Sequence, residues 1–204
     1  MIDENLPRSA LAEETLRLII RVRHGEDDGE LDASSQTVGI ISTRSSQTSV
    51  LRKKWTRETA LLRLMAIIET FVDGMAAERL RQLVNLDDPT FVRLIEDLEE
   101  NLGRNWQNRK DAYKGYFGFS LESRNGWSFV DAGIEVRNCM AHGFGTLTVQ
   151  QRKNSKIAAQ ISPIGATICD GRIHLNWQSI DRLSDGCMDF VRAVAKEIET
   201  SPPV

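Results

Sequence analysis

The chain of 204 residues is predicted to fold as an all-α helical bundle with a small β-hairpin inserted before its last helix. Most long segments repeat apolar residues at three- and four-residue steps, which is the periodicity of amphipathic helices. One segment, 166–175, instead places two short β-prone runs around Asp170-Gly171, a tight-turn dipeptide. The composition, 41% hydrophobic and 27% charged, is ordinary for a globular protein, so we expect a single domain over 1–204.

The N-terminal part is expected to hold two helices joined by a loop. The first helix is predicted to start near Ser9, because acidic residues fill its first turn and suit the helix dipole. Residues 24–49 are acidic at first and then rich in Ser, Thr and Gln, which predicts a long mobile loop, with a short strand over 38–41 as an alternative inside it. Residues 50–84 carry the strongest helical periodicity. Their apolar stripe consists of Trp55, Leu62, Met65, Ile68, Val72, Met75 and Leu83.

Turn and capping signals divide the middle of the chain. Asp87-Asp88-Pro89 is expected to end one helix and start the next, because Pro is favoured in the first helical turn. A further helix is predicted over 104–118. Asn125-Gly126 predicts a turn, after which Ser128 is expected to cap the helix that runs to His142.

The character of the chain changes after Gly145. The segment 146–149 (Thr-Leu-Thr-Val) has strand-like composition, and with the hairpin around Asp170-Gly171 it predicts a β-hairpin appendage over 146–176. Ser179 is then expected to cap the final helix. The apolar side of that helix consists of Ile180, Leu183, Phe190, Val191, Val194 and Ile198.

Composition and charge exclude several classes of function. The net charge is −3 at pH 7, so any contact with RNA must come from local basic clusters and not from a general positive field. No apolar run approaches the roughly 18 residues of a membrane span, and the N-terminus lacks the apolar core of a signal peptide. The three cysteines have no disulfide or zinc-ligand spacing. We therefore expect a cytoplasmic protein with no membrane contact and no metal site.

The segment that ends the predicted 128–142 helix carries most of the chemistry. Four residues separate Arg137 from His142, Asn138 directly follows the Arg, and Gly143 ends the helix. A loose search for Arg and His at such spacings should match about 0.8 times by chance, and requiring Asn after the Arg lowers this to about 0.04. On a helix, Asn138 and His142 share one face and Arg137 lies at its edge.

These three side chains suit the cleavage of RNA by its own 2′-OH. The Arg137 guanidinium can bind phosphate oxygens bidentately and stabilise charge on a phosphorane. The His142 imidazole can deprotonate the 2′-OH or protonate the leaving oxygen, and Asn138 can orient the substrate or the His142 ring. No metal or cofactor is required, because the nucleophile already belongs to the substrate.

The motif resembles that of the HEPN superfamily, in particular its short, single-domain prokaryotic members from toxin–antitoxin and phage-defence loci. The resemblance implies a HEPN-like helical bundle and a metal-independent endoribonuclease that acts as a toxin or abortive-infection effector, controlled by an antitoxin or another regulatory partner. It also implies a homodimer, in which two motif helices complete one composite site. We expect the interface of that dimer to include residues 128–145.

Two further positions bear on this resemblance. The segment 67–72 looks like the Glu-x-Phe segment of an early long helix in several HEPN families, where the Glu can approach the Arg/His pair. Glu69 is therefore a candidate supporting residue, and a solvated helix charge is the alternative. Phe144 stands where HEPN toxins silenced by a nucleotidyltransferase carry the Tyr that accepts the modification. Control through that Tyr is therefore not expected here.

Candidate RNA-binding residues lie elsewhere in the chain. Arg52, Lys53 and Lys54 form a basic cluster that can contact an RNA backbone, although such a run is also typical of a solvated surface. A second segment interleaves aromatic and basic residues, which either stack RNA bases or pack in the core. Its members are Trp106, Arg109, Lys110, Tyr113, Lys114, Tyr116 and Phe117.

Three functions remain open on the sequence. The first is the endoribonuclease. The second is a non-catalytic HEPN-like scaffold that binds RNA or protein through Arg137 and His142. The third is a nucleic-acid-binding regulator that uses the basic clusters.

Overall fold

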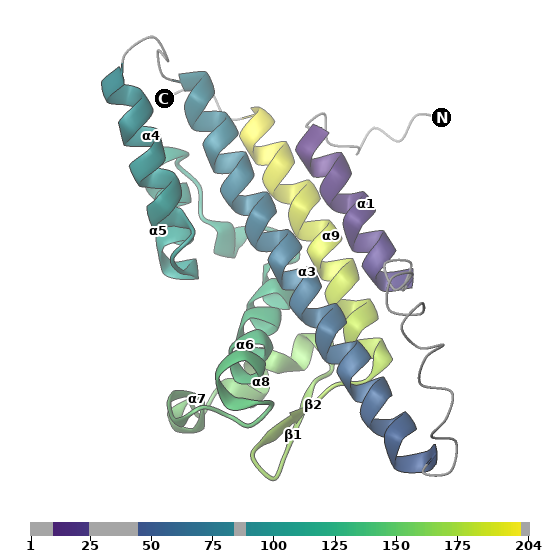
Figure 1. Ribbon diagram of the computed structural model, residues 1–204. Coiled ribbons are helices and arrows are strands. Elements are labelled where there is room, and N and C mark those ends of the chain that lie inside the picture. Colours follow the sequence, from purple (N-terminus) through teal and green to yellow (C-terminus); the bar gives the residue numbers. More distant parts are fainter. Residues whose placement is uncertain (1–9, 25–44, 84–88, 201–204) are drawn as a thin grey trace.

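The computed structural model of the protein describes residues 10–24, 45–83 and 89–200, and it is mostly helical there (Figure 1). The all-α class and the small antiparallel hairpin are confirmed. The helices are α1 (Ala10–His24), α3 (Ser45–Leu83), α4 (Pro89–Leu102), α5 (Trp106–Tyr116), α6 (Trp127–Gly143), α7 (Val149–Lys153), α8 (Ile157–Ile161) and α9 (Trp177–Thr200). The strands are β1 (Thr167–Cys169) and β2 (Arg172–His174), and two 3-10 turns are η3 (Leu121–Ser123) and η4 (Ser162–Ile164).

Three helices, α1, α3 and α9, lie side by side, and α3 runs from the upper left to the lower right of the molecule in Figure 1. The pair α4 and α5 lies along the outer side of α3, and α6 packs against both α3 and α9. The elements α7, α8 and the hairpin gather at the far end of α6 (Figure 1). Side chains from every described helix except α7, and from the hairpin, share one core. Its fully buried members include Ile19, Leu61, Leu64, Ile68, Phe71, Leu121, Val136, Ile161, Leu183 and Phe190.

Several predicted boundaries are confirmed and one loop boundary is wrong. α1 begins directly after Ser9, α4 begins at Pro89, and the hairpin turns at Asp170-Gly171. The loop predicted over 24–49 ends too late, because α3 already begins at Ser45. Residues 25–44, which include the alternative strand 38–41, lie outside the described residues.

Two predicted helix caps are wrong, because the caps depend on backbone shape and neighbours. α6 begins after Gly126, whose left-handed φ of 81° and lack of a Cβ suit a close approach to the Gly186 carbonyl, so Ser128 lies inside the helix. At the start of α9 the side chain of Asn176 accepts a hydrogen bond of 2.8 Å from the Ser179 backbone N–H. Ser179 Oγ in turn accepts one of 3.3 Å from the Asn176 N–H. Asn176 and Ser179 therefore make a reciprocal cap, with Ser179 as its buried inner partner.

The segment 146–176 is more helical than predicted. Only Thr146 of the expected strand makes a β-bridge, to Arg172, and α7 begins three residues later. Thr148 and Gln151 form a capping box at the start of α7, and this local signal outweighs the strand-like composition around it. The true hairpin is confined to 167–174.

The hairpin holds the loop that follows α6. The Ile173 N–H donates to the Gly145 carbonyl at 3.0 Å, and the Leu147 N–H donates to the Gly171 carbonyl at 2.8 Å. Ile173 itself is buried and pairs with Ile168 across the hairpin. These backbone hydrogen bonds join the hairpin to the loop that follows the C-terminal end of α6. Within the described ranges, no helix combines the length and the apolar character needed to cross a bilayer.

The close approach of α6 to α9 depends on Gly186. A Cβ at this position would lie 2.2 Å from Phe129 Cβ and 2.3 Å from Phe129 Cγ. Phe129 Cβ is bonded to the α6 backbone, so no side-chain rotation can move it away. The helices would have to move apart to accept any side chain at Gly186.

We predict that Gly186→Ala lowers the free energy of unfolding, measured by urea denaturation, by about 2–3 kcal/mol, which is typical of an overpacked core. Gly115→Ala is the matched control, because nothing lies within 4 Å of a Cβ at that helical position. The control should leave stability unchanged or raise it by up to about 1 kcal/mol. Equal stabilities of the two variants would show that α6 and α9 do not pack this closely.

Candidate functional site

One face of α6 is buried and an adjoining face is open, which places the motif at the surface. Gly133 and Val136 are buried, and Phe129 and Met140 pack against the core from partly buried positions. A Cβ on Gly133 would meet Met65 of α3 at 2.4 Å and Leu183 of α9 at 3.1 Å, so the helix is seated close to both neighbours. This apolar side leaves Arg137 and Asn138 half-buried and His142 exposed.

Arg137 has two polar neighbours. Its Nη1 donates to Asn138 Oδ1 at 3.4 Å, and its Nη2 lies 4.0 Å from Glu69 Oε2 of α3. The side chain of Arg137 is 39% exposed and that of Glu69 is 20% exposed. The guanidinium is thus flanked by a carboxylate on its inner side and remains open to solvent. The structure brings Glu69, Arg137 and Asn138 together.

The second carboxylate oxygen of Glu69 is also occupied. Trp106 Nε1, on α5, donates to Glu69 Oε1 at 3.0 Å. One carboxylate therefore joins α5, α3 and α6, with Oε1 held by the indole and Oε2 facing Arg137. Glu69 is not a freely solvated charge, which was the alternative left open by the sequence.

An ion pair one helical turn further along α3 anchors α5. Arg109, only 4% exposed, binds Asp73 through two hydrogen bonds, Nε to Oδ1 at 2.8 Å and Nη2 to Oδ2 at 2.7 Å. Its guanidinium also lies 5.2 Å from the centre of the Trp106 ring. Tyr113 adds a hydrogen bond of 2.7 Å to the Val72 carbonyl, and burial raises the pKa of its phenol. These contacts fix Trp106 against Glu69.

His142 occupies the last turn of α6 and is exposed. Within the part of the chain that the structure describes, its ring makes no hydrogen bond or ion pair, and Glu69 contacts Arg137 but not His142. The imidazole is therefore free to meet a ligand from solvent.

The backbone after His142 makes a left-handed turn. Phe144 has φ 49° and ψ 42°, and its N–H donates to the Cys139 carbonyl. Cys139 is fully buried, and burial raises the pKa of its thiol, as expected of a small core residue. The Phe144 ring is 92% exposed. From the sequence, Phe144 was noted only because it replaces the Tyr that some HEPN toxins carry at this position, and its exposure was not predicted.

A polar cluster lies on another side of α6 and was not predicted from the sequence. Gln151 of α7 donates through Nε2 to the backbone carbonyl of Glu135 at 2.8 Å and to its carboxylate at 2.9 Å. Partial burial, and then the charge of Glu135, raise the pKa of Asp131 one turn earlier. This cluster ties α7 to α6.

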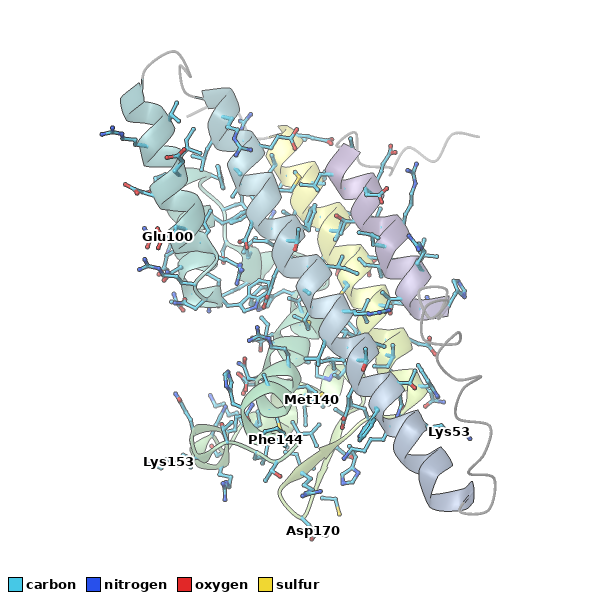
Figure 2. All side chains as sticks on the ribbon, in the orientation of Figure 1. Lys53, Glu100, Met140, Phe144, Lys153 and Asp170 are labelled. Atoms are coloured by element: carbon cyan, nitrogen blue, oxygen red, sulfur yellow. The ribbon has the colours of Figure 1, made fainter. Side chains whose placement is uncertain are left out.

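The predicted RNA-binding cluster makes no described contact with Arg137, although Lys54 pairs with Glu58, whose Oε1 would lie 4.0 Å from a Cβ on Gly145 after α6. Lys53 is exposed near the N-terminal end of α3, and Figure 2 shows it well separated from Met140 and Phe144. Lys54 pairs with Glu58 at 3.6 Å, and the side chain of Arg52 is outside the described residues. No described contact joins Lys53 or Lys54 to Arg137.

The interleaved aromatic and basic segment is largely structural. Arg109, Tyr113 and Phe117 are buried, and Lys110 pairs with Glu122 at 2.9 Å. Arg109, Tyr113 and Phe117 cannot stack RNA bases, because they are buried, whereas Tyr116 is 49% exposed and keeps the stacking alternative. Trp106 is the member that reaches the site. No local signal could have shown this, because its carboxylate partner lies 37 residues away in the sequence.

Searches of protein-family models, curated proteins and solved structures find no match to this chain. Among the described residues, no group of three or more His, Cys, Asp or Glu side chains lies close enough together to hold a metal ion. The interpretation of the site therefore depends on its own geometry.

We predict that the indole N–H of Trp106 reports on Glu69. Glu69→Gln replaces a charged acceptor with a neutral one, so the Trp106 Nε1–H resonance in a ¹⁵N–¹H spectrum should shift more than those of the other tryptophans. The coupling free energy between Glu69→Gln and Trp106→Phe should be about 1 kcal/mol, the size of one hydrogen bond.

Glu58→Gln is the matched control, because Glu58 is a half-buried carboxylate of α3 that pairs with Lys54. It should leave the Trp106 resonance in place. A Trp106 resonance that does not shift in Glu69→Gln would contradict the hydrogen bond between Trp106 and Glu69.

Proposed function

We propose that this protein is a HEPN-like, metal-independent endoribonuclease that cleaves RNA by attack of the 2′-OH on the adjacent phosphodiester. The observation that carries the proposal is the arrangement of Arg137 between Glu69 and Asn138 on the helix that ends at the exposed His142. It supplies a fixed cation for a phosphate and an accessible proton carrier on one element.

Each residue has a distinct role in this mechanism. Arg137 binds the scissile phosphate through its exposed edge and stabilises the charge that develops on the phosphorane. Glu69, itself held by Trp106, limits the rotation of the guanidinium and is a positioning residue. His142 moves the proton, and Asn138 orients the bound phosphate or the imidazole.

One imidazole cannot easily serve as both acid and base in a single turnover, so we propose that the enzyme is a C2 homodimer. The two α6 helices would face each other across the two-fold axis over residues 128–145, with both His142 rings lining one cleft. The buried face of α6 is already used inside the protomer, so this contact would use its outer side.

Uncontrolled RNA cleavage harms the cell that makes the enzyme. We therefore propose a cytoplasmic toxin or abortive-infection effector that is restrained by an antitoxin or another regulatory partner. The alternative is a non-catalytic RNA- or protein-binding scaffold, and one observation favours it: among the described residues, nothing orients the His142 ring.

The first prediction concerns cleavage. Purified protein should cut single-stranded RNA in the presence of EDTA and leave 2′,3′-cyclic phosphate ends. Removing a proton carrier or a phosphorane-stabilising cation typically costs a factor of about 10²–10⁴, so His142→Ala and Arg137→Ala should each lower kcat/KM by at least about a hundredfold.

Matched controls are His174→Ala and Arg192→Ala, which remove an exposed His and an exposed Arg from other elements. Both should cleave like wild type, and only the wild type and controls should arrest growth on expression. Dependence on a divalent metal, or full activity of His142→Ala, would overturn the mechanism. RNA binding without cleavage would support the scaffold.

The second prediction concerns assembly. Light scattering should give the mass of two chains, and Ala141→Arg, at an exposed position of the last turns of α6, should shift the protein toward monomer and lower cleavage in parallel. Ala158→Arg, at an exposed position of α8, is the control and should change neither. A fully active monomer would contradict the composite site.

A further inference from the structure

The ring of Phe144 is the most exposed of the large hydrophobic side chains in the described parts of the chain, at 92%. It occupies a backbone conformation that disfavours it. A left-handed residue at the end of a helix is usually Gly, because a side chain there adds strain, and Phe144 has φ 49° between Gly143 and Gly145. Neither packing nor backbone preference accounts for an aromatic residue at this position.

The backbone that carries the ring is held on several sides. The N–H groups of Phe144 and Gly145 both donate to the Cys139 carbonyl, the second at 3.3 Å. The Thr146 N–H donates to the Gly143 carbonyl at 2.8 Å, and the hairpin binds the Gly145 carbonyl at 3.0 Å. The ring is therefore presented from a fixed support, and little conformational freedom would be lost on binding.

The surroundings of Phe144 are polar and positively charged. The exposed His142 lies two residues before it, and Figure 2 shows Phe144 at the end of α6 on the side of Lys153. Exposed Arg152 and Lys153 lie on α7, and exposed Arg172 bridges Thr146 of the same loop. Of the acidic groups on this side, Glu58 pairs with Lys54 and Glu135 accepts a hydrogen bond from Gln151, while Asp170 is exposed at the hairpin turn.

We propose that Phe144 is a base-stacking subsite, on which one nucleobase of a single-stranded RNA lies while the adjoining phosphate contacts the basic residues of α7 and β2. This rests on the proposed function and adds to it the orientation of the substrate. An exposed aromatic face beside cations matches a base joined to phosphate. Phe144 lies within the segment 128–145 that is proposed for the dimer interface, so a contact between two copies through its ring is the outcome that the experiment must separate from stacking.

The experiment measures binding without cleavage. The probe is a 2′-O-methyl oligonucleotide, which lacks the attacking hydroxyl, compared by fluorescence anisotropy with an abasic oligonucleotide of equal length. Phe144→Ala and Phe144→Leu should weaken binding of the base-bearing probe about tenfold, as expected for one lost stacking contact, and leave the abasic probe unaffected. Phe144→Trp should bind as tightly as wild type or more tightly.

Two controls separate stacking from folding. Val149→Ala removes another exposed apolar side chain, 66% exposed at the start of α7, and should not change affinity. Phe144→Gly relieves the left-handed strain, so it should lose base-dependent binding without a lower unfolding temperature. A lower unfolding temperature would show that Phe144 serves the fold and would overturn the subsite.

The remaining outcomes separate this inference from the ribonuclease proposal. If wild type cleaves RNA but Phe144→Ala binds both probes normally, the subsite is wrong and the enzyme stands. If no cleavage occurs but base-dependent binding requires Phe144, the subsite stands and the enzyme does not. If Phe144→Ala dissociates a dimer without changing probe binding, the ring is a contact between copies and the subsite is wrong.

Discussion

The close packing of α6 between α3 and α9 controls where every motif side chain points. Glycines allow it: Gly186 accepts Phe129 at a distance that no larger residue could share, and Gly133 lies directly against the side-chain ends of Met65 and Leu183. Because protein interiors are close-packed, a small outward shift of α6 could not be absorbed by local adjustment. The same seating turns Arg137 toward Glu69 and leaves the last turn of α6 at the surface. The site thus depends on the core directly beneath it.

The helix α5 contributes a second constraint, which is electrostatic. Its buried Arg109 is neutralised by Asp73 through two short hydrogen bonds, an arrangement that is costly to break because an unpaired charge would remain inside. Trp106 lies one turn away on the same helix, and its ring packs against the Arg109 guanidinium, so the ion pair also fixes the position of Trp106. The indole can therefore orient the carboxylate of Glu69, which is only 20% exposed and so less screened than a surface charge. A structural ion pair in this way supports a polar group of the site.

At the end of α6 the backbone of Phe144 is strained, and its side chain makes no buried contact that would offset the strain. Phe144 adopts a left-handed conformation and buries almost none of its surface. Strained residues persist where the surrounding hydrogen bonds over-determine the backbone, and the hairpin and the Cys139 carbonyl do so here. The insertion between α6 and α9 thus serves the motif helix by fixing the loop after it.

The sequence by itself determined what depends on neighbours along the chain. Apolar periodicity predicted α3 and α9, Asp170-Gly171 predicted the hairpin turn, and the spacing of Arg137, Asn138 and His142 placed them on one helix. These properties follow from bonds and repeats within a few residues of each other. The capping box at Thr148 was also a local signal, and it was missed because β-prone neighbours suggested a strand.

Tertiary structure alone decided which distant groups meet. Periodicity assigns Glu69 to a helix face but cannot name its partners, and its contacts with Trp106 and Arg137 arise only when α5 and α6 pack on α3. The cap predicted at Ser128 failed for a related reason, since the Gly186 carbonyl of α9 helps to decide where α6 begins. The cap predicted at Ser179 failed for a local reason, since Asn176, three residues earlier, caps α9. The exposure of Phe144 likewise depends on how the hairpin shapes a three-residue turn. Such contacts are set by the global packing that brings separate helices together, and no single segment contains that information.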